Sequence, residues 1–136
     1  MKIKTTLLLL AAVYSVAFGL AARADIFVIA NPSVDLAADD IRDAFIGEKL
    51  MVTSIKLIPV DNAQAQAEFL TKVMSLDLNK YNSIWTKKGF RDGLNPPDVK
   101  GSDSDVLIYV RKTPGAVGYI ATMPAVTTGF KTIKKY

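Results

Sequence analysis

Short apolar runs separated by polar turns predict a chain of alternating strands and helices. Residues 26–30 form a continuous apolar run, which predicts a strand buried on both faces. A second strand is predicted over residues 55–60, and a third, β-branched and aromatic, over residues 117–120. Residues 130–135 are predicted to form a last strand at the sheet edge, where its lysines protect the edge from pairing with another chain.

Apolar positions at helical spacing fill the intervals between these runs. They predict helices over residues 36–45, over residues 63–75, from residue 78 onward, and up to residue 112. The expected N-terminal caps are Asp35, Asp61 or Asn62, Asp77, and Ser102 or Asp103. The last helix is stopped by Thr113-Pro114-Gly115, because Pro114 lacks a backbone donor and disfavours helix at Thr113.

The resulting order is strand, helix, strand, three helices and two strands. One mixed sheet flanked by helices accommodates this order with the fewest connections. The sequence therefore predicts a single α/β domain with a three-layer-like arrangement.

The first 24 residues are expected to lie outside this domain. Lys2 and Lys4 form a basic start, residues 7–20 are largely apolar, and Ala22-Arg23-Ala24 is a small-x-small cleavage site. These three parts are typical of a secretory signal peptide. We expect cleavage after Ala24 and a soluble mature domain of residues 25–136 in an extracytoplasmic space, most simply a periplasm. The alternative is an uncleaved anchor.

Charge and composition then narrow the function. Removing the leader takes three of the 17 basic residues, and the 14 that remain face 13 acidic ones, a net charge of +1. A charge this small gives no support to a nucleic-acid partner. Histidine and cysteine are absent, which excludes histidine-assisted nucleophiles, histidine or thiolate metal sites and disulfides. No catalytic residue, metal site or cofactor is predicted.

Two features invite a functional interpretation but have a structural one. Asp39 and Asp43 lie one helical turn apart and could act as a carboxylate pair, but nothing nearby completes a site, so a solvated helix face is expected. Trp85 could serve as a ligand platform, yet its spacing with Tyr81 on one helix face favours a core anchor.

The candidate binding region is the edge at which strands end. Ligands in α/β sheets usually sit beyond the carboxyl ends of strands. Two turns are expected there: Asn31-Pro32-Ser33, and Asp61-Asn62-Ala63-Gln64, which runs directly into a helix. A helix N-terminus offers backbone N–H groups and a partial positive charge, which suit an anion.

Three motifs resemble the phosphate-binding proteins of ABC transporters, within the type 2 periplasmic-binding superfamily. Ile41–Gly47 (IRDAFIG) matches the family helix that ends in Phe-Leu-Gly, and Pro59-Val60-Asp61 matches the strand before the phosphate loop. Thr113–Ile120 (TPGAVGYI) matches the Pro-Gly-Ala-Ile-Gly-Tyr-Val segment and is the most specific of the three. The chain is similar to a short, one-lobe member of this family.

This resemblance implies a binding protein for inorganic phosphate or a related oxyanion, working with a membrane transporter or another periplasmic protein. The candidate ligand-binding residues centre on the second turn: Asp61, Asn62, Ala63, Gln64 and Ala65. Ser33 and Arg91 are weaker candidates, chosen only for their position in loops. Asn62 to Ala65 stand where the family has Gly-Ser-Gly-Thr. The alternative is a ligand-free periplasmic interaction or sensor module derived from the same fold.

Overall fold

The computed structural model describes residues 25–136, and the predicted signal peptide lies outside the described residues. In chain order, the elements are β1 (Phe27–Ala30), η1 (Ala38–Asp40), α1 (Ile41–Phe45), β2 (Met51–Val52), β3 (Ile55–Lys56), β4 (Ile58–Asn62), α2 (Gln66–Phe69), η2 (Leu70–Met74), α3 (Leu78–Asp92), β5 (Asp98–Lys100), α4 (Asp103–Lys112), β6 (Ala116–Ile120) and β7 (Lys131–Lys135). None of the helices in this part of the chain is long and apolar enough to cross a membrane.

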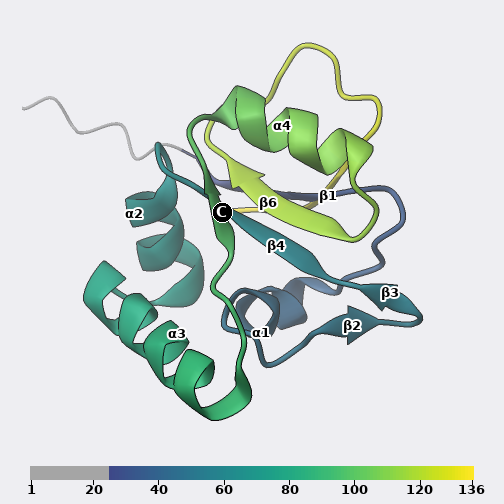
Figure 1. Cartoon of the computed structure of the whole chain (residues 1–136). Coiled ribbons are helices and arrows are strands. Elements are labelled where there is room, and N and C mark those ends of the chain that lie inside the picture. Colours follow the sequence, from purple (N-terminus) through teal and green to yellow (C-terminus); the bar gives the residue numbers. More distant parts are fainter. Residues whose placement is uncertain (1–24) are drawn as a thin grey trace, which may run out of the picture.

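The predicted mixed sheet is confirmed. It has five strands in the order β5-β4-β6-β1-β7. β4 runs parallel to β5 and β6, whereas β1 is antiparallel to both β6 and β7. Helices α1, α2 and α3 lie on one side of the sheet and α4 on the other (Figure 1). β2 and β3 form a separate hairpin.

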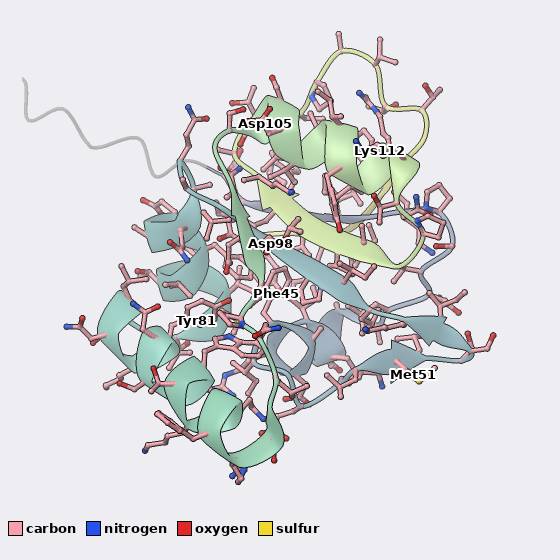
Figure 2. All side chains as sticks on the ribbon, in the orientation of Figure 1. Phe45, Met51, Tyr81, Asp98, Asp105 and Lys112 are labelled. Carbon is pink, nitrogen blue, oxygen red and sulfur yellow. The ribbon has the colours of Figure 1, made fainter. Side chains whose placement is uncertain are left out.

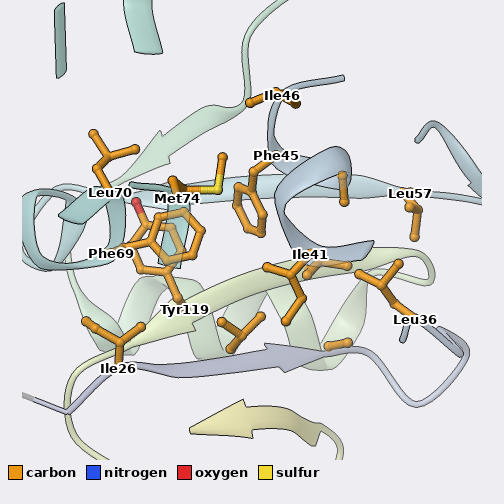
Figure 3. Packing of buried hydrophobic residues seen from close by; sticks show 14 of the residues in the cluster. Ile26, Leu36, Ile41, Phe45, Ile46, Leu57, Phe69, Leu70, Met74 and Tyr119 are labelled. Carbon is orange, nitrogen blue, oxygen red and sulfur yellow. The ribbon is translucent and has the colours of Figure 1, made fainter. Parts of the chain in front are cut away.

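Aromatic side chains fill the core on the α1–α3 face. The rings of Phe69 and Tyr119 stack with centroids 3.8 Å apart, and Phe45 meets Phe69 edge-on at 4.8 Å (Figure 3). Trp85 is buried on the same face, and its Nε1 donates to the Phe45 carbonyl at 3.1 Å. The prediction that Trp85 is a core anchor is confirmed.

Branched side chains pack the opposite face against α4. A Cβ placed on Gly118 would lie 2.7 Å from Cγ1 of Val106 and 3.2 Å from Cγ2 of Val60. Only a residue without a side chain therefore lets α4 approach β6 this closely. The predicted buried strand is confirmed, and each residue of β6 is buried.

Several boundaries differ from the prediction. The second strand divides into β3 and β4, and β4 continues through Asp61 and Asn62, which were expected to cap a helix. The helix expected from Ala63 begins at Gln66 and widens into a π-turn, η2, that ends at Ser75 in a left-handed conformation.

One local prediction was wrong, and one strand was missed. Asp35 does not cap the first helix, since η1 starts after Ala37 with no side-chain cap. β5 was not predicted, because its three residues are largely exposed and show no apolar alternation. β5 joins β4 only from Val60 onward, and Pro59 before it has no N–H group to donate.

Candidate functional site

The predicted binding turn lies where β4 ends beside β5 and β6, and it presents its residues to both faces of the sheet. Successive side chains on a strand point to opposite faces. Asp61 faces the aromatic core and α3, whereas Asn62 faces α4. The two polar residues therefore enter different environments, although they are adjacent in the sequence.

Asp61 is enclosed between two tyrosines. The hydroxyl of Tyr81, near the start of α3 (Figure 2), donates to one carboxylate oxygen, and the hydroxyl of Tyr119 donates to the other, each at 2.8 Å. Asp61 is 1% exposed. Burial raises the pKa of the Asp61 carboxyl, because the loss of solvation outweighs the two hydroxyl bonds that act in the opposite direction. Both oxygens are thus engaged inside the protein.

The two tyrosine hydroxyls respond to the same enclosure. The pKa values of Tyr81 and Tyr119 are raised, first by burial, then by the negative charge of Asp61 and by the hydrogen bonds to it. Both phenols therefore stay protonated and act as donors to the carboxylate. The three side chains form a closed cluster that joins β4, α3 and β6.

Asn62 is fully buried, and its side-chain amide makes three hydrogen bonds. Its Nδ2 donates to the Asp103 carboxylate at 2.7 Å and to the Tyr119 carbonyl at 3.0 Å. Its Oδ1 accepts from the Gln64 N–H group at 3.1 Å. The amide therefore links the end of β4 to α4 and β6 and holds the following turn.

The three backbone donors expected to bind an anion already have partners. The Ala63 N–H donates to the Lys100 carbonyl at 2.8 Å, and the Ala65 N–H donates to the Asn62 carbonyl at 3.1 Å. The Gln64 N–H donates to Asn62 Oδ1. The structure brings Asp61 to Ala65 together at one strand end, but turns these donors inward.

The other two candidates lie elsewhere. β1 is antiparallel to β6, whereas β4 is parallel to it, so Ser33 after β1 and Asn62 in β4 lie at opposite ends of the strands. The Ser33 Oγ accepts from the Gly115 N–H at 3.0 Å. Arg91 lies in the last turn of α3, about 15 Å along the helix from Tyr81. Its exposed guanidinium pairs with Asp92 at 3.2 Å.

Three residues of this region were missed by sequence reasoning: Tyr81, Tyr119 and Asp103. The tyrosines carried a signal, since each stands in a predicted buried element and a buried tyrosine hydroxyl needs a partner. Asp103 was interpreted only as a possible helix cap. Ser102 fills that role, with its Oγ accepting from the Asp105 N–H at 3.2 Å.

A separate hollow lies next to the C-terminal end of α3. It has a volume of about 560 Å³ and is lined by apolar side chains that include Trp85, Leu94 and Pro96. A second hollow, of about 310 Å³, shares these three residues and includes Phe90, which is 91% exposed. Among the described residues, no group of three or more acidic side chains could hold a metal ion.

Comparison with known proteins supports the fold. No family model matches the chain, and no curated protein is significantly similar to it. A phosphate ABC transporter substrate-binding protein from Clostridium perfringens, solved with bound phosphate, superposes with a TM-score of 0.51 at 16% identity over 82% of this chain and 46% of that chain.

A phosphate transport receptor from Vibrio cholerae superposes with a TM-score of 0.50 at 17% identity, over 82% of this chain and 47% of that one. This chain thus spans about half the length of the solved structures it matches. The fold resembles one lobe of a phosphate-binding protein.

Proposed function

We propose that this chain is a non-enzymatic extracytoplasmic binding module, built on one lobe of the substrate-binding-protein fold, that acts through contact with another protein and does not retain free phosphate alone. The inward hydrogen bonds of Ala63, Gln64 and Ala65 carry this proposal. An anion at this turn would have to displace bonds that the fold already makes. Asp61 also cannot turn toward a ligand without leaving two buried hydroxyls unpaired.

An exposed apolar surface supports the proposed contact. The two hollows beside α3 adjoin each other, and the side chains of Phe90, Leu50 and Met51 stand exposed at or near them. Aromatic side chains are enriched in protein–protein interfaces. Covering an exposed phenyl ring with a partner lowers the free energy, because apolar surface is removed from water. We therefore place the contact on this side of α3.

Titration calorimetry tests whether the isolated domain binds a free anion. Phosphate and sulfate are titrated into the purified mature domain at millimolar concentration and constant ionic strength. The proposal predicts no saturable heat for either anion. A stoichiometric binding isotherm for phosphate would contradict it.

Site-directed photocrosslinking tests the contact surface. In one variant, expressed in the native host, a photoreactive residue replaces Phe90. In the control variant it replaces Val126, which is 62% exposed and lies on the loop before β7. We expect a discrete adduct from position 90 and none from position 126. Equal labelling from both positions, or no adduct from either, would contradict the surface assignment.

A second candidate function is the binding of phosphate or a similar oxyanion between this lobe and an opposing protein surface. The observation that favours it is the phosphate bound to the Clostridium perfringens structure, whose chain is about twice the matched length. A single lobe leaves an anion half solvated, so each hydrogen bond contributes only about 0.5–1.5 kcal/mol. This candidate predicts calorimetric phosphate binding to the complex with a transporter or other partner, but not to the isolated chain.

A further inference from the structure

Three backbone or amide donors converge on the carboxylate of Asp103, in the first turn of α4. Asn62 Nδ2 donates to Oδ1 at 2.7 Å. The Ala121 N–H lies 3.2 Å from Oδ1 and 3.1 Å from Oδ2, and the Thr122 N–H donates to Oδ2 at 3.0 Å. Both oxygens of the carboxylate are therefore held by groups from β4 and from the segment after β6.

The Asn62 amide in this donor set is held by contacts other than the one to Asp103. Asn62 is 0% exposed, and its amide is oriented by separate bonds to the Tyr119 carbonyl and the Gln64 N–H. Ala121 and Thr122 follow the last residue of β6, so the end of this strand brings their N–H groups next to Asn62. β4 and β6 are parallel neighbours, and their carboxyl ends form the edge at which α/β sheets commonly bind ligands.

A role for Asp103 in stabilising the helix explains only part of this geometry. Acidic side chains are favourable in the first turn of a helix, but Asp105 occupies that turn as well (Figure 2). Ser102 already supplies the side-chain cap. Neither role requires a buried amide and two N–H groups from other elements to meet on one carboxylate.

We infer that this lobe contains an oxyanion pocket, formed by Asn62 Nδ2 and the N–H groups of Ala121 and Thr122, which its own Asp103 fills as an internal ligand. The pocket suits a carboxylate or a tetrahedral oxyanion, because each presents two oxygens that accept several hydrogen bonds. The negative charge of Asp103 excludes a free anion from the native pocket. This inference rests on the proposed function, since it explains why the native chain does not bind a free anion at this strand end.

The test is to remove the internal ligand and offer a free one. Asp103→Ala leaves Ser102 as the cap and removes the acceptor of the Ala121 and Thr122 N–H groups and one of the two acceptors of Asn62 Nδ2. Asp105→Ala makes the same change of charge in the same helical turn and leaves the pocket filled, so it is the matched control. Thermal unfolding of both variants and of the wild type is followed with and without about 20 mM phosphate, and separately sulfate, at ionic strength matched with potassium chloride.

We expect phosphate and sulfate to raise the melting temperature of Asp103→Ala by at least roughly 2 °C, as a millimolar dissociation constant implies. Asp105→Ala and the wild type should show no such rise. In an NMR titration of Asp103→Ala, the amide signals of Ala121 and Thr122 should shift in a saturable manner.

The outcomes separate this inference from the proposed function. If Asp103→Ala does not fold alone, refolding in phosphate but not in chloride would support the pocket. Failure to respond to either oxyanion, folded or unfolded, would overturn the inference and leave the proposed function intact. Saturable phosphate binding by the wild type would instead overturn the proposed function, and equal responses of both alanine variants would show charge effects without a pocket.

Discussion

Two buried or half-buried carboxylates near the end of β4, one on each face of the sheet, have different hydrogen-bond partners. On the α3 face, Asp61 is sealed against water, and its partners are the side-chain hydroxyls of Tyr81 and Tyr119. On the α4 face, Asp103 is half-buried, and its partners are the buried amide of Asn62 and backbone N–H groups. One carboxylate is held by side chains that pack in a core, and the other by donors at a strand edge.

This difference assigns separate roles to the two carboxylates near the end of β4: Asp61 to stability and Asp103 to the anion pocket. Tyrosine hydroxyls are placed by their rings, so the Asp61 cluster depends on the packing of the whole aromatic core. The N–H groups of Ala121 and Thr122 belong to the backbone just after β6, so their presence at the strand end does not depend on a packed side chain. We therefore expect changes at Asp61 to act on folding, and changes on the α4 face at Asp103 to act on anion binding.

Asp61→Ala should have the largest effect on stability. It leaves the hydroxyls of Tyr81 and Tyr119 buried without an acceptor, and each unpaired donor costs about 1–3 kcal/mol, so the loss should be roughly 2–6 kcal/mol. Chemical denaturation measures it. Asp43→Ala, at an exposed position on α1, is the control and should change the free energy of unfolding by less than about 0.5 kcal/mol. Equal effects at both positions would refute the sealed cluster.

Gly118→Ala should destabilise the α4 face by overpacking. The new Cβ would meet Val106 at 2.7 Å, which forces a shift that typically costs about 1–3 kcal/mol. Gly89→Ala is the matched control within α3, where the nearest atom to a new Cβ is 3.6 Å away. There alanine should stabilise the helix by about 0.5–1 kcal/mol. Changes of the same sign in both variants would contradict the packing described.

Ser102→Ala should weaken α4 by about 1 kcal/mol, since it removes the cap of the Asp105 N–H. Asp77→Ala should have an effect of similar size on α3, where Asp77 accepts from the Lys80 N–H at 2.8 Å. Hydrogen exchange should then rise in the first turn of the helix whose cap is removed. A rise in the opposite helix would show that the two faces are coupled more tightly than their contacts indicate.

The pH dependence should show the smallest effect. Because the pKa of Asp61 is raised in the folded state, the folded protein binds more protons than the unfolded chain between the two pKa values. Stability should therefore fall as pH rises through that interval, above the usual value of 3.8, and level off beyond it. Asp61→Asn should remove this fall, as measured by denaturation at a series of pH values. An unchanged slope would assign it to another group.

Much of the fold could be predicted from the sequence, because periodicity reports burial. The apolar run at residues 26–30 and the Val117–Ile120 run both became central strands. The relative direction of the strands could not be predicted from the sequence. Ser33 was placed near Asp61 on the expectation that both turns follow strands at one edge, but β1 runs antiparallel to its neighbours. Pairing direction depends on contacts between distant segments, which local patterns do not record.

The position of the candidate residues in the fold could be predicted, but not their hydrogen bonds. Asp61 and Asn62 are the last residues of β4, and Ala63 to Ala65 follow this strand. The donors at this turn bond internally because Asn62 accepts from Gln64 and β5 accepts from Ala63. β5 has no apolar signal, and Asp103 is 41 residues from its partner Asn62. Local sequence patterns could not reveal either contact.

The most direct test of the central claim is a phosphate titration of the isotopically labelled wild-type domain, followed by NMR at the amides of Ala63, Gln64 and Ala65. These N–H groups already donate within the protein. We predict that their chemical shifts stay constant to millimolar phosphate, apart from the changes that potassium chloride of equal ionic strength produces. Saturable shifts at these three amides, with one phosphate bound per chain, would contradict it.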